Sequence, residues 1–192
     1  MPSAGDQPGT VVDLVSEADG RWLAVAVLLF LASVSLLLGL PAVLRLFVPK
    51  VRLMGYAAIT TMVVAATAIA GYATVLVFFR ALVLSGALTG PELSETLADR
   101  GLGVFLSLLV LSFHLGEALV ATTLLRAGTI HRWVPVVLLA HAATLPLAGL
   151  FPEGVRDASL LLMMVGMCAI AIESNALEAR LVQSGPRVSP GT

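Results

Sequence analysis

The chain has 192 residues, of which 58% are apolar and only 12% are charged, and its formal net charge is −1. Soluble domains are roughly 45–50% apolar and about 25% charged, so water is not the main solvent of this chain. The small net charge excludes a basic surface for nucleic acid, and the single cysteine, Cys168, excludes an intramolecular disulfide and a paired-cysteine metal site. The composition therefore predicts an integral membrane protein whose main partner is the lipid bilayer.

Five apolar stretches are long enough, or nearly so, to cross a bilayer. A helix rises about 1.5 Å per residue, so about 20 apolar residues cover a hydrocarbon core of about 30 Å. In chain order the predicted spans are residues 22–46, 53–80, 102–126, 133–151 and 157–178. The sequence thus predicts an all-α bundle of five transmembrane helices within residues 21–182. Residues 1–20 are expected to be a disordered, acidic extracellular tail, and residues 183–192 a cytoplasmic tail.

The apolar cores of the first two spans carry no charged side chain. The acidic segment before the first span lacks the basic start of a signal peptide, so we expect this span to be retained. The second span is the predicted central helix, because it carries small residues that let neighbouring helix backbones approach closely. These residues are Ala65, Ala66, Ala70 and Gly71.

Two local features stand out in the later part of the chain. The connection between the second and third spans contains a short predicted helix that begins at Pro91 and Glu92, both favourable in a first helical turn. In the fourth span, Pro146 lacks a backbone donor and is expected to kink the helix near Ala142. The carbonyl freed by this kink could be satisfied by water or by Thr144.

The basic residues between the spans predict the orientation, because Lys and Arg are retained on the cytoplasmic side. With the amino terminus outside, seven of the eleven basic residues face the cytoplasm, and these are Arg45, Lys50, Arg52, Arg126, Arg132, Arg180 and Arg187. The other four face outward and are Arg21, Arg80, Arg100 and Arg156. The amino terminus is therefore predicted outside and the carboxyl terminus in the cytoplasm. Ten of the eleven basic residues are Arg and only Lys50 is Lys. Together with the richness in Ala, Val, Leu and Gly, this composition suggests a bacterial protein of the cytoplasmic (inner) membrane.

Ionisable residues within the last three spans form a predicted polar layer. Counted from the cytoplasmic ends at about 1.5 Å per residue, Glu117, His141 and Glu173 lie at depths of about 13, 12 and 10 Å. Asn175 comes near the same level, and His114 lies one turn above Glu117 on the same helix face. Two interpretations remain open. The layer is either interhelical hydrogen bonding that fixes helix register, or a site for a proton, a cation or a polar ligand.

Metal binding and catalysis receive little support from the same residues. His114 and Glu117 form an HxxE pair that, with His141 and Glu173, could in principle ligate zinc, iron or manganese. A single HxxE pair lacks the duplicated ligands of dimetal bundles, so we predict neither a metal nor a cofactor. The sequence contains no GxSxG elbow, no Walker A loop and no HExxH motif, so no catalytic residue is predicted.

One stretch resembles a known family. The segment LGEALVATTLLRAGTIHRWVPVVLLAHAATLPLAG, residues 115–149, is followed by a last span that contains Asn and Glu. Together they resemble small bacterial membrane proteins of unknown function, the DUF4386 family. Those proteins look similar in a Gly-containing helix, a short basic turn ending in a Pro-Arg-Trp-like triplet, and a hairpin of two more helices. Here the triplet is His131, Arg132 and Trp133, so the usual proline is replaced. The resemblance covers roughly the last 80 residues and implies no established active site.

The sequence predicts a structural or partner-binding membrane protein without enzymatic activity, whose partners are the bilayer and either other membrane proteins or a second copy of the chain. The alternative is a small proton- or ion-linked transporter, or a ligand sensor, that uses the Glu and His layer.

Overall fold

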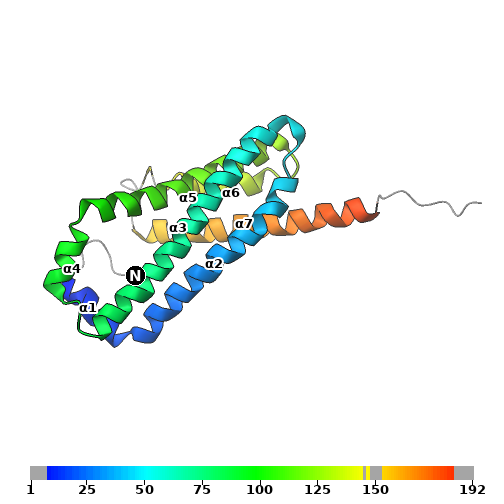
Figure 1. Cartoon of the computed structure of the whole chain (residues 1–192). Coiled ribbons are helices and arrows are strands. Elements are labelled where there is room, and N and C mark those ends of the chain that lie inside the picture. The colour runs from blue at the N-terminus through cyan, green and yellow to red at the C-terminus, as the bar shows by residue number, and fades with distance from the viewer. Residues whose placement is uncertain (1–7, 145, 148–152, 184–192) are drawn as a thin grey trace, which may run out of the picture. The chain divides into compact units, whose positions relative to one another are not determined.

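The structure is a computed structural model that describes residues 8–144, 146–147 and 153–183. Its regular elements within these residues are all helical, which confirms the predicted all-α class (Figure 1). In chain order they are α1 (Pro8–Glu17), α2 (Asp19–Arg45), the 3-10 turn η1 (Pro49–Val51), α3 (Arg52–Leu84), α4 (Gly90–Leu97), α5 (Arg100–Ala127), α6 (Trp133–Ala142) and α7 (Glu153–Gln183).

Four helical segments in the described residues are long and apolar enough to cross a membrane. They are Asp19–Arg45, Pro49–Leu84, Arg100–Ala127 and Ala158–Leu177. Large apolar side chains on them face outward: Leu38, Phe78 and Ile172 are 76%, 64% and 69% exposed. Apolar surface of this extent is unusual for a protein dissolved in water and is compatible with a multi-pass membrane protein.

The helix predicted over residues 133–151 is shorter than expected. α6 has 10 residues and ends at Ala142, so its length of about 15 Å covers about half of a hydrocarbon core. Pro146 cannot donate a hydrogen bond to the carbonyl four residues earlier, which accounts for an end at Ala142 rather than a kink. The hydroxyl of Thr144 donates to the carbonyl of His141 at 2.7 Å, so Thr144 satisfies a carbonyl at this point, as expected. Residues 145 and 148–152 lie outside the described residues.

The tail that the sequence analysis expected to be disordered contains a helix. α1 runs from Pro8 to Glu17 and packs against α4 (Figure 1). Its Val15 side chain is fully buried, as is nearly all of Leu93 in α4. Burial of these apolar groups offsets the entropy cost of ordering a short helix, a contribution that local composition does not reveal. Residues 1–7 and 184–192 lie outside the described residues.

The short helix predicted in the connection is confirmed. α4 begins at Gly90, and the Glu92 carboxylate accepts hydrogen bonds from the backbone N–H of Thr89 at 2.7 Å and from its hydroxyl at 3.0 Å. This arrangement resembles a capping box, in which an acidic side chain reaches back to the residue that precedes the helix. α5 starts after Asp99, whose carboxylate accepts a hydrogen bond from the N–H of Leu102 at 2.7 Å.

The chain divides into two compact units. Unit 1 consists of Met1–Leu38 and Thr61–Phe113, and unit 2 consists of Gly39–Thr60 and His114–Thr192, so α2, α3 and α5 each contribute to both. In unit 1, α2 approaches α3 at the predicted small-residue face. The hydroxyl of Ser33 donates to the carbonyl of Ala66 at 2.6 Å, and Ala65 and Ala66 are fully buried. Gly71, by contrast, faces open space.

The other ends of α2 and α3 also meet within unit 1. The indole N–H of Trp22 donates to the carbonyl of Leu76 at 3.1 Å, and its ring lies 5.7 Å from that of Phe79. The guanidinium of Arg80 forms a two-point ion pair with the carboxylate of Asp19, one contact being 2.8 Å long. Trp22 therefore joins α2 to α3.

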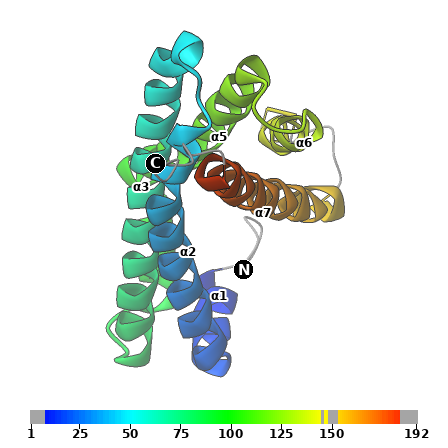
Figure 2. The ribbon, with the colours of Figure 1, turned by 90° about the vertical axis from the view of Figure 1, so that its right-hand side faces the viewer.

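Unit 2 contains two antiparallel helix pairings. α5 ends at Ala127 and is followed by Gly128, whose φ of +64° gives the left-handed turn that glycine adopts without steric cost. α6 then runs back along α5. α6 also packs along α7 (Figure 2). A Cβ at Gly166 of α7 would lie only 2.5 Å from a methyl group of Leu138 of α6, so the two helices touch closely at this point.

Candidate functional site

Glu117 lies on the buried stripe of α5. The buried residues Glu117, Val120, Ala121 and Leu124 follow the i, i+3, i+4, i+7 spacing of one helix face. On α6, the buried residues Val134, Leu138, His141 and Ala142 follow the same kind of spacing. Both helices therefore place one buried ionisable side chain among mostly apolar buried residues.

The two inward ionisable side chains form a pair. The Nδ1 atom of His141 lies 2.6 Å from the Oε2 atom of Glu117, and the two residues are 3% and 0% exposed. His141 is also in the last turn of α6, where the negative end of the helix dipole favours a cation. This short contact joins α5 to α6 in the buried interior of unit 2.

His114 joins this pair through its ring. The imidazoles of His114 and His141 are stacked, with ring centroids 5.3 Å apart and planes inclined by 18°. His114 and Glu117 are one helical turn apart on α5, as predicted, and both side chains contact the ring of His141. The structure therefore brings together three of the five residues predicted for the polar layer.

One oxygen of Glu117 has no partner among the residues that the structure describes. Oε2 is bonded to His141, whereas Oε1 is buried and accepts no hydrogen bond from them. Most buried polar atoms in proteins are hydrogen-bonded, and an unsatisfied charged group is among the most costly exceptions. This atom is the feature of the site that interhelical packing alone leaves unexplained.

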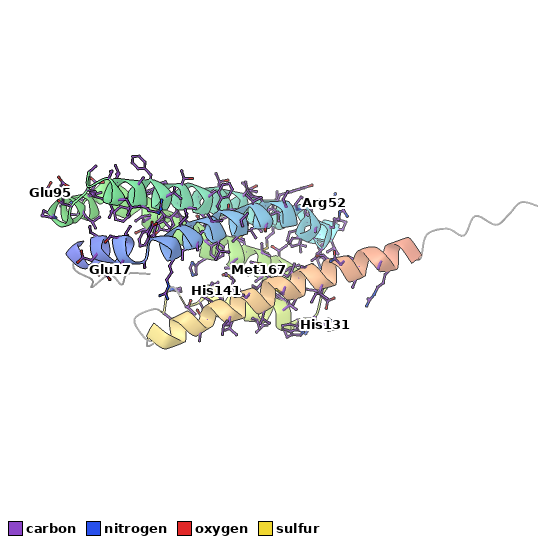
Figure 3. The ribbon with its side chains drawn as sticks, turned by 90° about the horizontal axis from the view of Figure 1, so that it is seen from below. Glu17, Arg52, Glu95, His131, His141 and Met167 are labelled. Atoms are coloured by element: carbon purple, nitrogen blue, oxygen red, sulfur yellow. The ribbon has the colours of Figure 1, made fainter. Side chains whose placement is uncertain are left out.

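Glu173 lies elsewhere, which corrects the predicted common level. Its Oε1 atom pairs with Nδ1 of His131, just before α6, whereas His141 is at the opposite end of that helix (Figure 3). The ten residues of α6 separate the two pairs by about 15 Å. The prediction was wrong because it counted the depth of Glu173 from Arg180, whereas the pairing with His131 places Glu173 level with the start of α6.

The second pair has a different environment. The side chains of His131 and Glu173 are 73% and 25% exposed, so solvent or headgroups reach most of the imidazole. Asn175, two residues further along α7, is exposed and belongs to neither pair. The single predicted layer is therefore replaced by two separate carboxylate–imidazole pairs, one buried and one exposed.

Sequence reasoning missed His131 as a partner of Glu173. A signal was available in the spacing: two antiparallel helices that join His131 to Glu173 also bring residue 138 opposite residue 166, where a glycine stands. The close contact between Leu138 and Gly166 fits this register. The pairing of two helices that are adjacent in the sequence was therefore a better guide to depth than the positions of the flanking arginines.

The chemistry available at these pairs is limited to hydrogen bonding, proton exchange and cation binding. In the described part of the chain, no three His, Cys, Asp or Glu side chains are placed so that they could hold a metal ion between them. Cys168 is exposed on α7. Comparison of the chain with protein-family models, with curated proteins and with solved structures finds no match.

Proposed function

We propose that the chain is a multi-pass membrane protein that crosses the bilayer five times, with its amino terminus outside and its carboxyl terminus in the cytoplasm. Support for the fifth crossing comes from helix direction in unit 2. Since α6 is antiparallel to both α5 and α7, the latter two run in the same direction. If both of them cross, the chain between them has to return through the membrane. α6 forms the first half of this return.

The orientation is supported by the basic residues, and single-cysteine labelling tests it. In a Cys168→Ala background, we expect Glu95→Cys to react with a membrane-impermeant maleimide in intact cells. Lys50→Cys and Arg180→Cys should react only after the membrane is permeabilised. Labelling of Lys50→Cys from outside would reverse the orientation. If Arg180→Cys were labelled from outside while Lys50→Cys was not, the chain would cross the membrane four times.

Within this topology the chain acts as a structural or partner-binding protein without enzymatic activity. The observation that carries this proposal is the fully buried pair of Glu117 and His141, which ties α5 to α6 inside an apolar unit. Buried polar contacts of this kind fix which helix faces meet in membrane bundles. The apolar outer faces then remain available for lipid, for other membrane proteins or for a second copy. The scarcity of lysine in the chain and the resemblance to the DUF4386 family support a location in a bacterial inner membrane.

The test of this role uses the amide isostere. Glu117→Gln keeps a hydrogen-bonding side chain of the same shape and removes the charge. If the pair is structural, Glu117→Gln should restore the wild-type phenotype to a strain that lacks the gene for this chain, as fully as the parent chain does. Glu173→Gln is the matched control at the exposed pair. Loss of complementation by Glu117→Gln alone, at parental expression and helix content, would contradict a purely structural role.

A second function is favoured by one observation, the unpartnered Oε1 atom of Glu117. Ionisable groups inside a membrane commonly mark pathways for protons or ions. The chain would then be a small proton- or ion-linked carrier, or a sensor of such a ligand. Proteoliposomes that contain a pH-sensitive dye test it: a carrier would dissipate an imposed proton or sodium gradient, and Glu117→Gln would not.

A further inference from the structure

Two short connections of the chain meet at one end of unit 2. The connection between α2 and α3 and the connection between α5 and α6 both belong to this unit. The hydroxyl of Thr129, in the second connection, donates to the carbonyl of Leu46, in the first, at 2.8 Å. Leu46 and Ile130 are buried, so each connection also contributes an apolar side chain to the interior. The hydrogen bond joins the two connections into one surface, and Figure 3 labels Arg52 and His131 at this end of the ribbon.

The side chains of this surface are strongly basic. Residues 45–56 and 126–133 contain five Arg or Lys and no Asp or Glu. All five are exposed, and they are Arg45, Lys50, Arg52, Arg126 and Arg132, which together we call the basic surface. The side chains of Lys50, Arg52 and Arg132 form no ion pair with any residue that the structure describes. In unit 1, by contrast, the guanidinium of Arg80 is paired with Asp19. The described residues therefore leave much of the charge of the basic surface unbalanced.

Exposed apolar and aromatic side chains accompany these cations. Leu53 directly follows Arg52 and is 85% exposed, and Trp133 directly follows Arg132 and is half exposed. Tyr56, one helical turn after Arg52 on α3, is also half exposed. Trp and Tyr rings are typical of the level of lipid headgroups. A soluble anion would match only the cations, whereas a phospholipid presents a phosphate and an acyl chain side by side and so matches both kinds of side chain.

We propose that the basic surface binds the phosphate groups of anionic phospholipids in the cytoplasmic leaflet. The inference rests on the topology proposed above, which places both connections in the cytoplasm, and it goes beyond that topology by naming a lipid class. Guanidinium groups suit this ligand because their planar fork donates two parallel hydrogen bonds to phosphate oxygens. The guanidinium of Arg126 lies 3.2 Å from Sδ of Met54, which holds it beside the first turn of α3. Cations from both connections are thus presented to one layer of headgroups.

Native mass spectrometry of the purified full-length chain in detergent tests the proposal. Phosphatidylglycerol and phosphatidylcholine with the same acyl chains are titrated separately, and the anionic lipid should bind more tightly. Lys50→Gln and Arg132→Gln, one in each connection, should each weaken phosphatidylglycerol binding about fivefold, because a basic residue near an anionic headgroup contributes about 1 kcal/mol. The double variant should lose about 25-fold, with phosphatidylcholine binding unchanged. Arg21→Gln combined with Arg100→Gln removes two exposed cations from unit 1 and should leave both affinities unchanged.

The proposal is overturned if the parent binds both lipids alike, or if Arg132→Gln alone leaves phosphatidylglycerol binding unchanged. Lys50→Arg keeps the charge and should retain the parental affinity, and far-UV circular dichroism checks that each variant keeps its helix content. Glycerol 3-phosphate, which has the phosphate but no acyl chain, should not displace the lipid at equal concentration. Displacement would identify a soluble anion as the ligand and reject the lipid. A detergent micelle has no sides, so this result is independent of the orientation, which the cysteine labelling tests separately.

Discussion

The two ends of α6 carry the same chemistry in opposite surroundings. At one end Glu117 and His141 are 0% and 3% exposed, and at the other the side chains of His131 and Glu173 are 73% and 25% exposed. Both pairs join an Nδ1 atom to a carboxylate oxygen across neighbouring helices. The difference lies only in what else the charges can contact.

This difference decides what each pair contributes. Charges at the exposed pair keep much of their hydration, so forming the pair gains little and losing it costs little. The polar atoms of the buried pair have lost their water, so each side chain depends on the other for its hydrogen bond. The contribution of each pair to stability therefore depends on its environment at that end of α6 and not on residue type alone.

The largest effect is expected from His141→Ala. Removing the imidazole leaves the Glu117 carboxylate buried without its partner, and we expect the free energy of unfolding to fall by about 3–5 kcal/mol. Thermal or denaturant unfolding in detergent, followed by far-UV circular dichroism, measures it. His131→Ala is the matched control at the exposed end. Equal losses in the two variants would contradict the contrast between the pairs.

Replacing both buried partners together should abolish this loss. A chain with Glu117→Met and His141→Phe keeps similar side-chain volumes and removes both charges. Buried ion pairs replaced in this way are often neutral or stabilising by about 1–4 kcal/mol, so the double variant should be at least as stable as the parent. The same unfolding assay applies. If the double variant were less stable than Glu117→Met alone and His141→Phe alone, the attraction between the two side chains would contribute more free energy than their desolvation costs.

Sequence reasoning succeeded for features that depend on a single helix. The positions of α2, α3, α5 and α7 follow from runs of about 20 or more apolar residues, and α4 follows from Pro91 and Glu92. Glu117 and His141 were predicted at a common depth, counted from Arg126 and Trp133 at the ends of their helices, and their contact fits that prediction. These features need only the helical rise and a short connection.

The missed features depend on contacts between segments distant in sequence. The partner of Glu173 follows from the register of α6 against α7, which the Leu138 and Gly166 contact helps to set. α1 forms a helix because it packs on α4, which lies more than 70 residues later in the chain. Gly71 was predicted to support close packing, yet it faces open space, since composition cannot tell which face of a helix meets a neighbour.

Gly166 offers a way to disturb the helix between the two pairs. In Gly166→Ala the new methyl group would lie 2.5 Å from the Leu138 side chain, so α6 and α7 have to separate or repack. Overpacking costs about 1–3 kcal/mol, against about 0.5–1 kcal/mol gained from the higher helix propensity of alanine. We expect a net loss of about 1 kcal/mol. Gly71→Ala, with open space around it, is the control and should be slightly stabilising. A stabilised Gly166→Ala would show that the two helices are not in tight contact.

The smallest effect is expected at the exposed pair, where Glu173→Gln removes one charge. Since His131 is mostly exposed, the loss should stay below about 1 kcal/mol. It should also shrink in 1 M choline chloride, because the screening length falls to about 3 Å at that ionic strength. Glu117→Gln should be insensitive to choline, since salt does not enter an apolar interior to screen a buried pair. Unfolding midpoints of the parent and both variants at low and high choline concentration measure the difference. If both variants responded to salt alike, solvent would reach Glu117, and burial would no longer separate the two ends of α6.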